Sequence, residues 1–200
     1  MMLTELASIP QASLPVAEFR DHLKIGTGFG DEAVQDTVLE RSLRAAVAAI
    51  ERRTGKTLFS RDFRLTVEAW SDADRQVLPL APVSAVTSVT LRDAEGTVTV
   101  VDPSSWRLIR DFQRPSVAGL GGSLPTLAAD GSAEIVFTAG FAATWSGLPA
   151  DLGQAVLLLA AHFHENRHAA SEAGGEAIPF GLLALLERWR QVRLTAGARP

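Results

Sequence analysis

The sequence contains one motif that is typical of a catalytic metal site. Residues 164–168 read His-Glu-Asn-Arg-His, an H-E-x-x-H string that on a helix places two imidazoles one turn apart for Zn²⁺, with a glutamate beside them as general base. Arg167 adds a positive charge within the motif, and no third ligand has a fixed position, since Glu172 and Glu176 follow in a glycine-containing loop. The motif also ends a predicted helix, whereas a catalytic site needs rigid support. We therefore predict no metal site, and a zinc metalloprotease acting through His164 and Glu165 is kept as an alternative.

No other group of residues in the sequence supports catalysis. The glycines at positions 26, 28 and 30 are not followed by the Gly-Lys-Ser/Thr of a phosphate-binding loop. Ser146 lacks the G-x-S-x-G frame of a hydrolase nucleophile, and the chain has no cysteine that could act as a nucleophile or a metal ligand. We predict a protein that is not an enzyme and needs no cofactor.

Composition and charge indicate a folded protein whose main role is not to grip nucleic acid. The 200 residues are 46% hydrophobic and 21% charged, with a formal net charge of −4, which excludes a disordered chain and disfavours a DNA-binding one. A small nucleic-acid-binding regulator stays an alternative because of a local basic patch. This patch near the C-terminus consists of Arg188, Arg190, Arg193 and Arg199. Its cations either complement a helix dipole or bind a partner.

Nothing in the sequence predicts secretion or insertion into a membrane. The longest apolar stretch, residues 155–161, is far shorter than the roughly 20 residues that cross a bilayer. Residues 1–16 lack the basic start and the continuous apolar segment of a secretory signal. We expect synthesis in the cytoplasm and no membrane partner.

Apolar residues at three- and four-residue spacing predict helices towards both ends of the chain. The expected helices cover residues 15–26, 31–53, 155–166 and 182–192, and Asp31 is a plausible N-cap for the second. The third is apolar on all sides, which predicts a central position or an interface.

Between these helices the apolar period changes to two, which predicts an antiparallel β region. The expected strands cover residues 57–67, 86–91, 97–101, 106–109 and 133–137. The second and third of them flank a turn that ends at Gly96, so we expect a hairpin there.

Residues 112–130 have no clean period and contain several glycines and prolines, which predicts a projecting loop or an irregular arm. A projecting element can reach a neighbouring molecule. The candidate subunit contacts in this segment are Phe112, Arg114, Leu120 and Leu124.

The predicted fold class is α+β, with a helical bundle formed by the N- and C-terminal helices and an inserted antiparallel β region. We expect the N-terminal helices within residues 1–56, the inserted region at 57–140 with its long loop at 112–130, and the C-terminal helices at 148–200.

Several stretches of the chain carry a resemblance to a known family. Residues 148–167 read LPADLGQAVLLLAAHFHENR and residues 178–190 read IPFGLLALLERWR. Together with LPVAEFRDHLK at 14–24, AAVAAIERRTGK at 45–56 and PVSAVTSV at 82–89, they resemble the head–tail connector (adaptor, or head-completion) proteins of tailed bacteriophages and of phage-derived particles such as gene transfer agents. His164 departs from that family, which more often has Tyr there, and this substitution creates the H-E-x-x-H string.

The resemblance implies a structural protein of a virion or phage-like particle, made in the bacterial cytoplasm. Such a protein forms a homo-oligomeric ring, usually twelve-fold, under the portal protein, and it meets a tail-side connector or stopper protein on its other side. DNA passes through the lumen of the ring without sequence-specific binding. We expect the four arginines of the C-terminal basic patch to contact the portal, because a guanidinium pairs with carboxylates in a planar fork.

Overall fold

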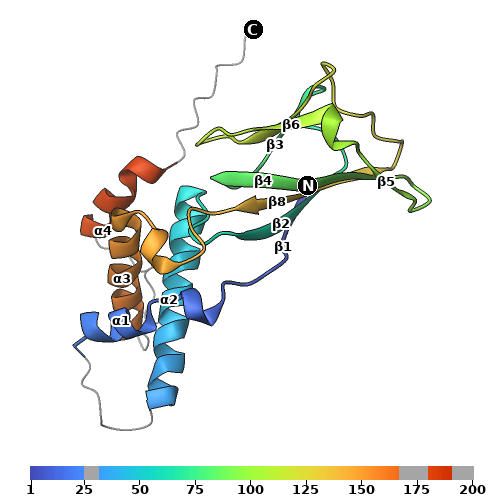
Figure 1. Ribbon diagram of the computed structural model, residues 1–200. Helices are drawn as coiled ribbons and strands as arrows, with labels where there is room; N and C mark the ends of the chain where they lie inside the picture. Colours follow the sequence, from blue (N-terminus) through green and yellow to red (C-terminus); the bar gives the residue numbers. More distant parts are fainter. Residues whose placement is uncertain (25–31, 167–179, 191–200) are drawn as a thin grey trace.

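The computed structural model describes residues 1–24, 32–166 and 180–190. Figure 1 shows the helices gathered at one end of the molecule and the strands at the other. The four α-helices are α1 (Val16–His22), α2 (Glu32–Thr54), α3 (Ala150–Glu165) and α4 (Phe180–Leu186). Short 3₁₀ helices are η1 (Gln11–Ser13), η2 (Pro103–Ser105), η3 (Trp145–Gly147) and η5 (Glu187–Trp189).

The long helix α2 forms because its apolar residues fall on one face. Leu39, Leu43 and Ile50 recur at helical spacing, and all three are buried. The helix ends at Thr54, since Gly55 adopts a φ of +66°, a left-handed conformation that glycine enters at little cost. The predicted helix at residues 31–53 is thereby confirmed.

All four helices contribute to one hydrophobic core. The buried side chains come from both ends of the chain and include Phe19 of α1, Leu43 of α2, Val156 and Leu159 of α3, and Leu182 of α4. Helix α3 contacts each of the other three helices. The predicted central position of the apolar helix is correct, although its Leu158 remains partly exposed.

The strands form two antiparallel sheets. The five-stranded sheet has the order β1-β2-β8-β4-β5, with bounds β1 Met2–Glu5, β2 Arg61–Val67, β8 Ser132–Ala139, β4 Val83–Arg92 and β5 Val98–Val100. The three-stranded sheet has the order β3-β7-β6, with bounds β3 Arg75–Val77, β7 Ser116–Gly119 and β6 Trp106–Ile109. The predicted α+β class and the predicted hairpin between β4 and β5 are confirmed.

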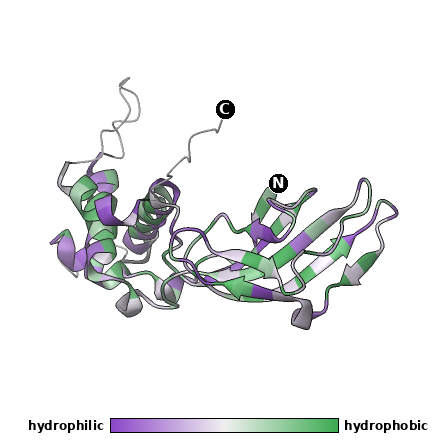
Figure 2. Ribbon diagram, turned by 90° about the horizontal axis from the view of Figure 1, so that it is seen from above, coloured by the Kyte–Doolittle hydropathy of each residue, from purple (hydrophilic) through white to green (hydrophobic). Residues whose placement is uncertain are grey.

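The two sheets face each other across a second core. Leu65, Val89 and Ile135 of the larger sheet pack in one cluster with Trp106 and Val117 of the smaller one. Along β8, buried and partly exposed residues alternate, as expected for a strand with one core-facing side. Figure 2 shows that hydrophobic stretches predominate on the strands and are interrupted by hydrophilic residues.

Two expectations about the elements need correction. Residues 112–130 are not one long loop, because Ser116–Gly119 form β7, the central strand of the smaller sheet. The last helix does not continue to residue 192: α4 ends at Leu186, a 3₁₀ turn follows, and Arg190 is extended. The sequence also gave no sign of strand β1, in which every residue is exposed.

The stacked pair at the centre of the second core yields a test. Phe137 is completely buried and stacks on Phe63 with 5.8 Å between ring centroids. We expect Phe137→Ala to lower the free energy of unfolding by about 3–5 kcal/mol, because the ring leaves a cavity. Val136→Ala, on the opposite face of β8, should cost about 1 kcal/mol or less. Urea unfolding measures both, and equal losses would contradict the assigned faces.

Candidate functional site

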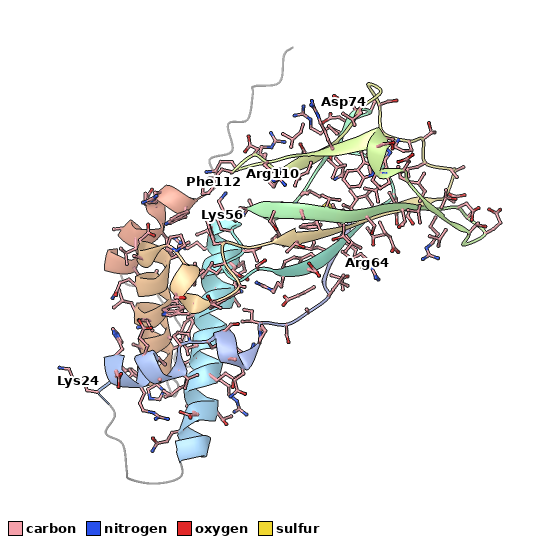
Figure 3. The ribbon with its side chains drawn as sticks, viewed as in Figure 1. Lys24, Lys56, Arg64, Asp74, Arg110 and Phe112 are labelled. Carbon is pink, nitrogen blue, oxygen red and sulfur yellow. The ribbon has the colours of Figure 1, made fainter. Side chains whose placement is uncertain are left out.

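Lys56 is a fully buried cation at the point where the helices meet the strands. Its ammonium group donates hydrogen bonds to the carbonyl oxygen of Phe112 and, over 3.1 Å, to Oε1 of Gln113. It also lies 4.3 Å from the centroid of the Phe112 ring, a cation–π arrangement. Figure 3 shows Lys56 and Phe112 close together at this junction. Burial lowers the pKa of Lys56, and the negative charge of Asp111 opposes that shift.

The turn that Lys56 contacts is ordered by its own carboxylate. Asp111 accepts hydrogen bonds of 2.7 Å from the backbone N–H groups of Gln113 and Arg114. These bonds lower the pKa of Asp111, because they favour its charged form. The turn therefore presents Phe112 in a defined position between the helical core and the smaller sheet.

The end of the C-terminal helix docks onto this turn through aromatic contacts. Trp189 lies 5.8 Å from the ring of Phe112 and 5.2 Å from that of Phe141. Its indole N–H donates a 2.8 Å hydrogen bond to the carboxylate of Asp151 at the start of α3. We call Lys56, Phe112, Phe141, Asp151 and Trp189 the junction cluster. We call residues 190–200 the C-terminal segment. The junction cluster fixes the point at which this segment begins.

Two of the four predicted portal contacts lie in the described part of the chain, next to the junction cluster. Arg188 is exposed, stacks over the Trp189 ring at 4.6 Å and lies 3.5 Å from the Asp151 carboxylate. Arg190 is exposed as well, and its guanidinium lies 3.7 Å from Glu187. Arg193 and Arg199 lie outside the described residues. Each of the two exposed arginines thus lies near a carboxylate of the same chain.

The four candidate subunit contacts have different surroundings. Leu120 and Arg114 are exposed, and Phe112 is 47% exposed although it belongs to the junction cluster. Leu124 is only 5% exposed and packs in the core between the sheets. Its proposed role as a surface contact therefore needs correction, since the chain folds back after β7 and turns this side chain inward.

The H-E-x-x-H string does not form a recognisable site in the described residues. Helix α3 ends at Glu165 with Asn166 as C-cap, and Arg167 and His168 lie outside the described residues. The ring of His164 packs edge-on against Phe19, with 6.4 Å between centroids. Among residues 1–24, 32–166 and 180–190, no group of three or more potential metal ligands comes together. In the same ranges, no helix has the length and apolarity to cross a membrane.

Comparison with solved structures gives full-length matches to components of one kind of particle. A chain from the neck of an empty gene transfer agent particle, computed with C6 symmetry, is 53% identical, with 100% of both chains covered and a TM-score of 0.89. A chain from the virion of a native gene transfer agent particle is 52% identical over 98% of this chain and 99% of that one, with a TM-score of 0.85. The chain belongs to the head–tail connector family of gene transfer agents.

A third solved structure agrees with this assignment. It is a chain from the neck of a native gene transfer agent particle computed with C12 symmetry, 50% identical over 100% of both chains, with a TM-score of 0.83. No family model matches the sequence, and no curated protein matches it. The resemblance seen at residues 148–167 and 178–190 is thereby confirmed. This connector is a structural protein and not an enzyme, so the metalloprotease alternative is set aside, and so is the nucleic-acid-binding regulator.

Sequence reasoning missed the most unusual residue of the junction, Lys56. No local pattern marks it, because its burial depends on a carbonyl oxygen 56 positions further along the chain. The one available signal was that a lysine directly follows the glycine that ends a long amphipathic helix.

Lys56 yields a test with a defined pH dependence. Lys56→Met leaves the Phe112 carbonyl without its donor, and we expect it to lower the free energy of unfolding by about 1–3 kcal/mol near neutral pH. Because burial lowers the pKa of Lys56 in the folded state, the unfolded state binds its proton more tightly. The stability of the wild type relative to the variant should therefore increase as the pH rises from about 7 towards the ordinary lysine pKa. Urea unfolding across this range measures it, and a difference independent of pH would contradict the lowered pKa.

Proposed function

We propose that this protein is a structural head–tail connector subunit that forms a ring in the neck of a gene transfer agent particle. The observation that carries this function is the 53% identity over the full length of both chains with a component of such a neck. A twelve-fold ring fits the relative whose neck was computed with C12 symmetry. The subunit is located at the head–tail junction of the particle.

The finer assignment of partners is part of the same proposal. One face of the ring meets the portal protein, the other meets a tail-side connector or stopper protein, and DNA passes through the lumen without sequence-specific binding. The weakly acidic chain, with a net charge of −4, supports passage of DNA without tight binding.

The C-terminal segment is the proposed portal contact. Trp189 is 5% exposed and anchors the start of this segment in the junction cluster. The exposed Arg188 lies just before the segment and Arg190 at its start, and Arg193 and Arg199 follow in the sequence. Planar guanidinium groups suit carboxylates on the rim of a partner.

The division of labour within the chain follows from the two cores. The helices within residues 1–56 and 148–200 act as one bundle, which carries the C-terminal segment. Residues 57–140 act as an inserted β region, to which the N-terminal strand β1 adds one edge strand. The shared helical core and the separate core between the sheets support this division. Phe112, Arg114 and Leu120 remain candidate contacts to a neighbouring subunit, because all three are exposed.

Deletion of the gene followed by complementation tests this function. Without the connector, we expect DNA-filled heads that lack tails, and the wild-type gene should restore tailed particles. A chain truncated after Gln191 keeps the anchor Trp189, so it should fold with a near-normal melting temperature but fail to join heads to tails. Electron microscopy counts tailed particles, and Arg41→Gln, at an exposed position of α2 to which no contact is assigned, serves as a control away from the C-terminal segment.

Two outcomes would contradict these assignments separately. Normal numbers of tailed particles in the deletion strain would exclude the connector function. Normal numbers with only the truncated chain would leave that function in place and assign the portal contact to another surface.

A further inference from the structure

Exposed apolar side chains concentrate at the two edge strands of the five-stranded sheet. Nine large hydrophobic side chains are exposed in the described part of the chain. Six of them lie on or beside these edges, namely Met1, Met2, Leu3 and Leu6 around β1, and Val98 and Val100 on β5. Proteins normally protect their sheet edges, because an apolar edge with free backbone groups invites another strand. Both edges therefore have the character of interaction surfaces.

The two edge strands run in the same direction. Four antiparallel pairings separate β1 from β5, through β2, β8 and β4. An even number of reversals restores the original direction. A second copy placed beside the first without being turned over would thus bring its β1 parallel to β5.

The hydrogen-bond alternation shows which backbone groups each edge offers. In β1 the N–H of Leu6 bonds to Asp62, so by alternation the backbone groups of Met2 and Thr4 also face β2, and those of Leu3 face outward. In β5 the N–H of Val101 bonds to Val89. By the same alternation the backbone groups of Val98 and Val100 face away from β4.

The pairing registers place the exposed side chains of Met2, Val98 and Val100 on a common face. Opposed residues of neighbouring strands share a face of the sheet. One row of opposed residues crosses the whole five-stranded sheet and consists of Met2, Thr66, Glu134, Thr90 and Val100. This face also carries Arg64, which lies away from the smaller sheet in Figure 3. In a neighbouring copy displaced along this row, Met2 would come to lie beside Val100 of the first copy.

We propose that β5 of one subunit pairs in parallel with β1 of the next, so that the five-stranded sheets join edge to edge around the ring. The inference rests on the proposed function, since it names the contact between copies of this chain. In a parallel pair with Val100 opposite Met2, the backbone N–H and C=O of Val100 bond to the residues on either side of Met2. One of these residues is Leu3, whose backbone groups face outward from β1. The contact is heterologous, which is the type that closes into a ring. It also covers the exposed side chains of Met2, Val98 and Val100.

A pair of engineered cysteines tests the contact in assembled particles. The chain contains no cysteine, so any disulfide comes from the introduced pair. Opposed residues on adjacent strands lie about 4.8 Å apart, within the range that a disulfide spans. We expect Met2→Cys combined with Val100→Cys to give, on oxidation, a ladder of multimers up to the size of the ring on a non-reducing gel. Each single variant should give at most a dimer.

A proline substitution tests the backbone pairing itself. The N–H of Val100 faces away from β4, so Val100→Pro should leave the melting temperature of the isolated subunit within about 2 °C while ring formation is lost. The matched control is Thr99→Pro, whose missing N–H belongs to the pairing with β4 and which should lower the melting temperature. Light scattering and particle imaging report assembly.

The outcomes separate this inference from the proposed function. A second cysteine pair, Thr4→Cys with Val100→Cys, tests the same pairing with the register shifted by two residues. If rings form in the neck but neither cysteine pair gives a ladder of multimers, the edge pairing is wrong and the connector function stays intact. A disulfide between the double-cysteine subunit and a different protein, with no ladder, would also overturn the edge pairing, because another partner would then occupy the edge. Absence of the chain from the neck would instead contradict the proposed function.

Discussion

The burial of one charge constrains how the two parts of the subunit meet. An ammonium group without hydrogen-bond acceptors is costly inside a protein, and Lys56 obtains its acceptors from the turn at residues 111–114. Because Lys56 directly follows α2 and the turn directly precedes β7, these bonds tie the helical core to the core between the sheets. Phe112 of the same turn packs on Trp189, so the end of the C-terminal helix is positioned by the same contacts.

A connector subunit has to present different surfaces to its neighbours and to the parts of the particle on either side. The fold separates the surfaces that we propose for these roles. The C-terminal segment leaves from the junction cluster, where Arg188 is stacked on Trp189, whereas the two apolar sheet edges lie in the β part of the molecule (Figure 1). An odd number of antiparallel strands gives edges of equal direction, which lets identical copies join in series without being turned over.

The elements that could be predicted from the sequence are those in which the spacing of apolar residues matches the buried face. Helix α2 and strand β8 show the apolar period of their exposed and buried faces. Strand β7 is four residues of small and medium size of which the first three are all buried, so no alternation marks it. Strand β1 is exposed throughout and has no alternation to detect. The family resemblance, in contrast, depends on residue identities, and it covered most of the chain.

The candidate site was predicted only in part for the same reason. The arginines of the basic patch are visible in the sequence. The junction cluster is not, because its contacts join Lys56, Phe112 and Trp189, which are distant from one another along the chain. Leu124 was misassigned because a leucine in a glycine-rich segment looks the same whether it faces solvent or the core.

Imaging of the particle neck, with density assigned to this chain, tests the central claim most directly. The account predicts a closed ring of this subunit between the portal and the tail, with symmetry compatible with twelve copies. Density for this chain elsewhere in the particle, or a neck complete without it, would contradict the connector function.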